Sequence, residues 1–298
     1  MEEYTFSSGL MHFSRMPGKP GFIWKFLAAY TVAFLILFVM MGVISGLVVP
    51  TFTSDFLTTG AANTTDPVMI LVVLGVMVLG ALIMAVFEAA ALRRYIHAAD
   101  FRLRFGIEEV RLLGVYVIWF VMLSLSYVLL GLVVGLISFL FMMGGGAAGG
   151  AFASLSVIAV FLSFSALPLI MLAIVTKASS ASAMTIRDGK FTFFPAAHVT
   201  IGRFWKVYFA YILVYLGLFL VMVVVQLLMT LAMVSTGTGA SASGAPAVTA
   251  GIIAMFMMLV LPALTGFGQL VTLGMTSKLV LTDPEWKGRA DQLAETFN

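Results

Sequence analysis

The sequence predicts an all-helical integral membrane protein whose six transmembrane helices form three repeated hairpins. Hydrophobic residues make up 62% of the 298-residue chain and charged residues 10%, whereas soluble domains average about half and about a quarter. Six uncharged apolar runs each reach the length of about 20 residues that a transmembrane helix needs. An ungapped similarity between residues 21–38 and 202–219 predicts that the hairpins are repeats.

Two kinds of connection separate the six runs. The connections after the first, third and fifth runs are polar or glycine-rich and contain no lysine or arginine, whereas all 16 basic residues lie on the other side. By the positive-inside rule, we expect both termini in the cytoplasm and these three connections outside. The runs are residues 26–49, 68–87, 112–143, 151–176, 207–234 and 248–277.

The amino terminus and the cysteine content restrict the class further. The first 20 residues include two acids at the start and no short apolar core before a cleavage site. We therefore expect the first membrane helix to act as an uncleaved signal for a bacterial inner membrane. The chain has no cysteine, which excludes disulfides and thiolate metal sites.

A cation and a tyrosine five residues apart mark the start of each predicted hairpin. Residues 21–38 and 202–219 also share a glycine, a tryptophan before the cation and a final phenylalanine. We predict parallel repeats over residues 1–98, 99–188 and 189–283, followed by a cytoplasmic amphipathic tail, residues 284–298. The marking pairs are Lys25 with Tyr30, Arg111 with Tyr116, and Lys206 with Tyr211.

Each predicted hairpin follows a cytoplasmic segment that mixes cations with aromatic residues, as in residues 4–16, 93–111 and 187–206. Such segments suit the headgroup layer, with cations toward anionic lipid and rings toward the acyl chains. Nucleic-acid binding is disfavoured, because the patches are short, adjoin membrane spans and contain acids. The predicted lipid anchors are Trp24, Lys25, Arg111, Trp205, Lys206 and Trp286.

Few polar residues fall within or beside the spans. Glu88 and Lys177 lie near the inner ends, where a long side chain reaches water, and Glu88 would pair with a lysine or with Arg93. A sharper hypothesis is an ion pair between Glu88 and Lys177 at the inner mouth of a central cleft. Gln226 and Gln269 fall in opposite halves of their helices, so each is expected to hydrogen-bond to a neighbouring helix separately.

Two prolines, Pro168 and Pro262, interrupt long spans. Each frees a backbone carbonyl four residues earlier, and that carbonyl must find another partner within the membrane. We interpret both as packing kinks; the alternative is a pair of hinges or cavity-lining bends.

The sequence offers little chemistry. A metal centre built on His97 and His198 is disfavoured because the three histidines, including His12, are far apart and show no ligand spacing. There is no nucleophile elbow and no phosphate-binding loop. We expect neither a cofactor nor an enzymatic activity.

A family resemblance rests on two short cytoplasmic elbows that combine basic and aromatic residues. They are the segment from Arg203 to Lys206, and the run after Glu88 that contains Arg93-Arg94. In these elbows and in its six spans, the chain resembles uncharacterised bacterial inner-membrane proteins similar to the membrane domain of some glycerophosphodiester phosphodiesterases. The resemblance implies a six-span membrane domain and supplies no catalytic residue.

Two functions are compatible with these features. We expect a lipid-contacting scaffold or accessory subunit of a membrane assembly, because the spans carry almost no charge and the cytoplasmic segments suit a lipid surface. The alternative is a transporter of a small or lipidic molecule through a cleft between the hairpins.

Overall fold

The computed structural model describes residues 4–15, 21–48, 67–144, 169–235, 245–284 and 286. Within these residues the chain forms helices and no strand. Six helices are long and apolar enough to cross a membrane, which confirms the predicted multi-pass, all-helical class. Pro168 and the segment before it lie outside the described residues.

Five long helices coincide with predicted runs but extend further at the ends predicted to be cytoplasmic, which we call the inner ends. They are α3 (Phe22–Val48), α5 (Pro67–His97), α6 (Ile107–Gly144), α10 (Phe204–Ser235) and α11 (Ala245–Leu281). The sixth candidate span is Leu169–Asp188, which bends at residues 179–180 and continues as α8 (Ala181–Asp188). The inner ends stay helical beyond the apolar runs because they pack against one another, which orders residues that sequence polarity alone would assign to loops.

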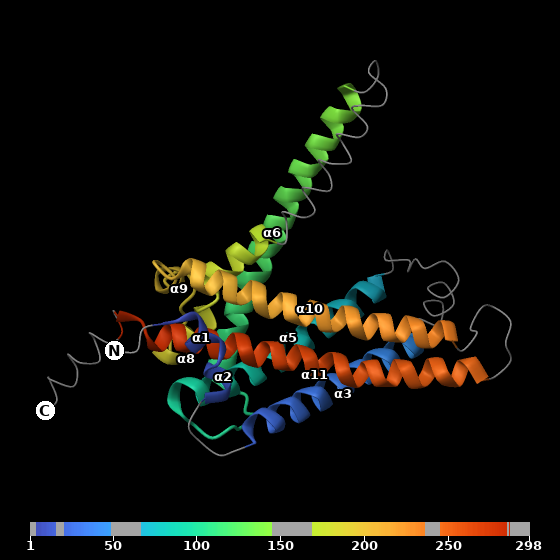
Figure 1. Ribbon diagram of the computed structural model, residues 1–298, viewed down its shortest axis with the longest axis horizontal. Coiled ribbons are helices and arrows are strands. Elements are labelled where there is room, and N and C mark those ends of the chain that lie inside the picture. Colours follow the sequence, from blue (N-terminus) through green and yellow to red (C-terminus); the bar gives the residue numbers. More distant parts are fainter. Residues whose placement is uncertain are drawn as a thin grey trace, which may run out of the picture.

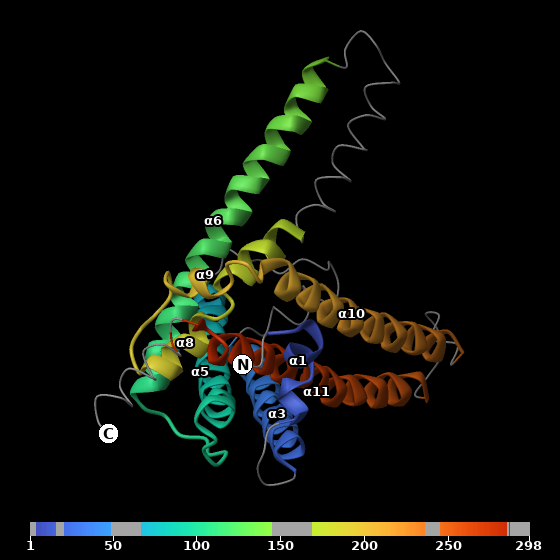
Figure 2. The same ribbon diagram turned by 60° about the vertical axis from the view of Figure 1, so that its left-hand side comes forward.

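Helix α11 is the centre of the arrangement. It packs against α3 on one side and α10 on the other, and it also contacts α5 and α8. Figures 1 and 2 show α10 and α11 running side by side, whereas α6 diverges from them. Helix α6 touches the other helices through α5 and α8.

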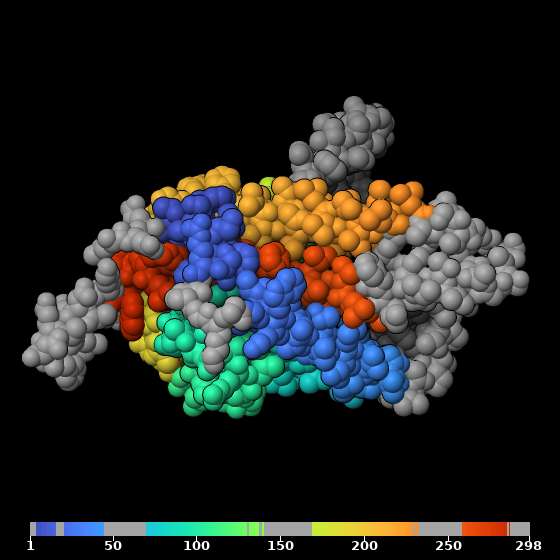
Figure 3. Space-filling view, turned by 60° about the horizontal axis from the view of Figure 1, so that its bottom comes forward, coloured from blue at the N-terminus to red at the C-terminus, as the bar shows by residue number. Residues whose placement is uncertain are grey.

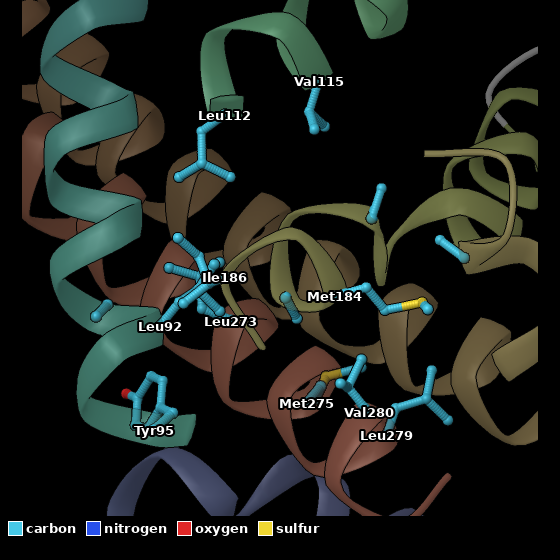
Figure 4. Close-up of a cluster of buried hydrophobic side chains, with 14 of the residues drawn as sticks. Leu92, Tyr95, Leu112, Val115, Met184, Ile186, Leu273, Met275, Leu279 and Val280 are labelled. Atoms are coloured by element: carbon cyan, nitrogen blue, oxygen red, sulfur yellow. The ribbon is translucent and has the colours of Figure 1, made fainter. Parts of the chain in front are cut away.

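The hydrophobic core gathers the inner ends of several helices (Figure 4). Leu92 of α5, Ile186 of α8 and Leu273 of α11 point toward one another and are 6% exposed or less. Leu112 and Val115 of α6 complete this cluster from above in that view. Farther along the spans, apolar side chains such as Leu132 remain exposed, as they would toward lipid.

The amino-terminal segment folds as two short helices, α1 (Phe6–Leu10) and α2 (His12–Arg15). Thr5 and Ser8 form a reciprocal capping box that starts α1, with the Ser8 amide donating to Thr5 Oγ1 over 3.2 Å. Both helices pack against α11, and Figure 3 shows this segment lying over α10 and α11. The segment predicted to lie in the headgroup layer therefore packs on the protein itself.

The remaining short helix, α9 (Ala196–Val199), lies in the connection from α8 to α10. Ser180, at the bend before α8, donates its hydroxyl to the Ala196 carbonyl over 2.9 Å and so ties this connection to the core. Gly189 ends α8 with a φ of 60°. This left-handed conformation is readily adopted by glycine.

Candidate functional site

The candidate site is the set of polar side chains buried where the inner ends of the spans meet. Burying such groups costs free energy unless they find hydrogen-bond or ionic partners, so their pairing indicates which groups are structural. Among the described residues, the acidic and basic side chains that are buried belong to Glu88, Arg93, Arg94, Glu109, Arg187 and Asp283.

Glu88 lies on α5 and is 8% exposed. Its carboxylate accepts a hydrogen bond from the Tyr116 hydroxyl of α6, and the Ser182 hydroxyl of α8 also lies beside it. A buried carboxylate needs such donors because water no longer solvates it. Glu88 thereby links α5 to both α6 and α8.

The predicted ion pair between Glu88 and Lys177 is not formed. Lys177 is exposed, and no ion pair links it to Glu88 in the part of the chain that the structure describes. Arg93, the other proposed partner of Glu88, pairs with different acids. Tyr116 takes the place of a cation because it projects from α6 toward α5, whereas the bend after residue 178 leaves Lys177 outside the core.

The tyrosines of the three aligned segments all face this core. Tyr30 and Tyr211 are 2% and 4% exposed, and Tyr116 is half-buried. The charge of Glu88 lies close enough to act electrostatically on all three hydroxyls. Tyr30 donates to the sulfur of Met84 over 3.1 Å. The five-residue spacing thus places one tyrosine per aligned segment near Glu88.

A second polar cluster links α5 to the start of α6. Arg93 Nη1 contacts Glu108 Oε2 and Glu109 Oε1, each at 2.6 Å, and Glu109 is fully buried. Glu109 Oε2 also accepts the Gly106 amide over 2.8 Å. Acids in the first turn suit the positive end of the helix dipole. Arg93 and Arg94, which begin the segment 93–111 predicted to lie in the headgroup layer, are each only 7% exposed.

A third cluster surrounds Arg187 at the end of α8. Its guanidinium contacts Asp188 at 2.7 Å and Asp283 at 3.2 Å, and it donates to the Val280 carbonyl of α11. Trp286, predicted to be a lipid anchor, is half-buried with its ring 4.5 Å from the Arg187 guanidinium carbon. This contact is a cation–π interaction. It gives Trp286 a contact within the protein that its spacing in the sequence did not indicate.

The other predicted anchors differ in exposure. Trp24 and Trp205 are 76% and 64% exposed, and Lys25 and Lys206 next to them are also exposed. Arg111 is half-buried. The two tryptophan–lysine pairs are therefore free to contact the surroundings, as a lipid anchor requires.

The glutamines and the described proline occupy distinct environments. Gln226 is exposed on α10, and Gln269 is half-buried on α11 with its Oε1 buried and without a hydrogen-bond partner. Pro262 is buried within α11, where the Thr265 hydroxyl donates to the Leu261 and Pro262 carbonyls over 2.9 and 3.0 Å. Neither of these is the carbonyl that Pro262 frees, which lies four residues earlier at Met258.

A surface hollow of about 900 Å³ lies over the connection between α8 and α10. Its lining includes Lys190, His198 and Arg203 together with Phe191 and Ile201. The sequence predicts cations and aromatic rings in this connection, but it does not indicate that they surround a concavity. The hollow depends on how α9 and the carboxyl end of α11 are placed by tertiary packing.

A different cavity, of about 330 Å³, lies between α3 and α5 toward their outer ends, and its lining is entirely apolar. Among the described residues, no three histidine or acidic side chains are grouped so as to hold a metal ion. His97 lies 3.4 Å from the Ile186 carbonyl, and His198 belongs to the surface hollow. No protein-family model, curated protein or solved structure matches the chain.

Proposed function

We propose that this protein is a non-enzymatic, lipid-contacting scaffold or accessory subunit of a bacterial inner-membrane assembly. The observation that carries the proposal is the contrast between its two regions. Charged groups at the inner ends pair with one another, as Arg93 does with Glu108 and Glu109. The spans instead present apolar side chains outward, including Phe120 and Phe219, which are 60% and 61% exposed. Such surfaces suit lipid or the helices of a partner.

The topology belongs to the same proposal. Both termini would be cytoplasmic, and three hairpins would repeat about an axis along the membrane normal. The similar environments of Tyr30, Tyr116 and Tyr211 support the repeat. So do Gly21 and Gly202, aligned in sequence, which both have positive φ, at 93° and 75°. Because the chain has no cysteine, single cysteines at Ser54 and Ser241 test the orientation. Impermeant maleimide should label them only from outside.

The scaffold role is tested by photocrosslinking in intact membranes. Benzoylphenylalanine would replace Phe120 or Phe219 on the exposed faces, and Phe26, which is fully buried, serves as the matched control. We expect protein adducts of discrete mass from the exposed positions and none from Phe26. Adducts to lipid alone from both exposed positions would contradict an accessory subunit.

A transporter is the second candidate, and one observation favours it. Gln269 Oε1 is buried without a partner on α11, and Glu88 places a carboxylate within a candidate span. Buried polar groups inside a membrane are typical of substrate or ion pathways. Loss of solute uptake into liposomes on replacing Glu88 with Gln or Gln269 with Leu, with the protein still folded, would favour transport over the scaffold.

A further inference from the structure

We propose that the surface hollow over the α8–α10 connection binds the phosphate of one anionic phospholipid headgroup. The inference rests on the proposed function, because the hollow must lie in the cytoplasmic headgroup layer. It goes further in assigning a defined site, with Lys190 as a principal ligand, where the proposed function requires only diffuse contact between cations and lipid.

The size of the hollow fits a small ligand. Its volume of about 900 Å³ lies within the range of about 300–1,000 Å³ that is usual for ligand sites. A smaller hollow of about 210 Å³ adjoins it, shares His198 and Ile201 with it, and is lined by Lys177. Helix α9 therefore carries His198 between two concavities, each with a lysine in its lining.

The charges around the hollow favour an anion. Asp188 and Asp283 also line it, but Arg187 contacts both carboxylates, at 2.7 and 3.2 Å, from beneath. Lys190 is exposed and forms no ion pair with any described residue. The lining itself holds Lys190 and Arg203, so that with Arg187 three cations face two carboxylates and the net charge around the hollow is positive.

Arg203 is held in place for this role. Its Nη1 donates to Thr282 Oγ1 over 3.1 Å, and its Nη2 donates to the Thr282 carbonyl over 3.0 Å. Both acceptors are neutral, so they orient the guanidinium without cancelling its charge. An arginine held by two hydrogen bonds, together with an exposed lysine, is a suitable arrangement for phosphate oxygens.

The surroundings of the hollow favour a lipid over a soluble anion. Phe191 and Ile201 in its lining are 46% and 69% exposed, and nearby in the chain Phe194 and Trp205 are 72% and 64% exposed. Large apolar side chains grouped beside cations suit the boundary between headgroups and acyl chains. A soluble phosphate would leave these rings in water.

The test compares lipid binding to the purified full-length protein by native mass spectrometry, titrating phosphatidylglycerol, phosphatidylcholine or inorganic phosphate at matched ionic strength. The variant is Lys190→Gln; the controls are Arg15→Gln and Arg102→Gln, exposed cations outside the hollow that are not among the predicted lipid anchors. We expect preferential binding of one phosphatidylglycerol, weakened about fivefold by Lys190→Gln and unchanged in the controls. Melting temperatures check that each variant is folded.

Three results would overturn the site and separate its failure from that of the proposed function. Equal weakening by all three variants, Lys190→Gln and the two arginine controls, would mean diffuse lipid contact, which leaves the proposed function standing. Equal binding of both lipids by the unmodified protein would contradict the site and the proposed preference for anionic lipid together. Binding of inorganic phosphate that depends on Lys190, without a lipid preference, would assign the hollow to a soluble anion.

Discussion

The Tyr116 hydroxyl on α6 donates a hydrogen bond to the buried Glu88 carboxylate on α5. This contact is one of several that hold the start of α6 against α5 and α8, whereas the rest of α6 diverges from α10 and α11 (Figures 1 and 2). It also explains how a carboxylate is kept beside an apolar run without a neighbouring cation. The contact is therefore structural, and it involves the Glu88 carboxylate, which is the polar group most relevant to the alternative of a transporter.

Replacing Tyr116 with Phe should destabilise the protein by about 1–3 kcal/mol, because Glu88 loses a buried donor. The control is Tyr127→Phe on the same helix, where the side chain is 58% exposed. The measurement is the midpoint of thermal unfolding in detergent. In Glu88→Leu the hydroxyl no longer has its acceptor, so adding Tyr116→Phe should cost less than in the unmodified protein. Strict additivity would refute the coupling.

Replacing Arg187 with Met should destabilise the protein by about 3–5 kcal/mol, because two aspartates and a carbonyl lose their partner in a buried site. Arg104→Gln is the matched control. Arg104 also contacts an acid, Glu108 at 3.4 Å, but its side chain is 62% exposed, and exposed pairs contribute about 1 kcal/mol or less. Denaturant titration followed by circular dichroism gives both values. Similar losses in the two variants would show that burial does not govern these pairs.

Replacing Gly274 with Ala should displace α2 from α11. A β-carbon at this position would lie 2.8 Å from the backbone nitrogen of Phe13, and a backbone atom cannot move aside as a flexible side chain can. Hydrogen exchange in residues 4–15 should therefore increase. Gly217→Ala is the control, since its β-carbon would meet nothing within 4 Å and alanine favours the helix of α10. Unchanged protection in Gly274→Ala would disprove the close packing.

Replacing Ala98 with Gly should stabilise the protein by about 1 kcal/mol, because a left-handed backbone is strained for residues with a β-carbon. Ala98 has a φ of 51° just after α5, and the following amide, Ala99, bonds to the Arg93 carbonyl at 3.4 Å. This pattern is a helix stop that usually carries glycine. Ala99→Gly should give no such increase in melting temperature. A destabilised Ala98→Gly would argue against the assigned conformation.

Replacing Tyr4 with Phe should preserve or raise stability at neutral pH, because the buried Tyr4 hydroxyl has no hydrogen-bond partner. Burial raises the pKa of Tyr4 from 10.0 to about 12, although the charge of Arg203 opposes the shift. The unfolded chain therefore loses this proton first, and stability should fall as pH rises from 10 toward 12. Tyr4→Phe should lessen that loss in thermal unfolding scans, and an identical pH profile in both proteins would count against the burial of Tyr4.

The amino-acid sequence by itself determined the membrane class and the positions of five of the six candidate spans. The fourth predicted run, residues 151–176, overlaps the candidate span Leu169–Asp188 only over residues 169–176, and the rest of that run lies outside the described residues. Long uncharged runs such as those containing Leu132 and Phe219 are expected to cross a membrane, because the length and the apolar composition of a segment are sufficient to predict its insertion into the bilayer. Sequence spacing also placed Tyr30, Tyr116 and Tyr211 at matching positions. Trp24 and Trp205, predicted as anchors from their place beside a lysine, are exposed as anchoring requires.

Only the tertiary structure decided which polar groups meet. Glu88 and Lys177 both lie near inner ends, yet the bend after residue 178 exposes the lysine and Tyr116 reaches the carboxylate instead. Arg93 and Arg187 resemble lipid-facing cations in sequence, but acids brought in from other helices or adjacent turns bury them. The reason is physical: burial of a charge depends on the direction and distance of partners remote in the chain, which local composition does not encode.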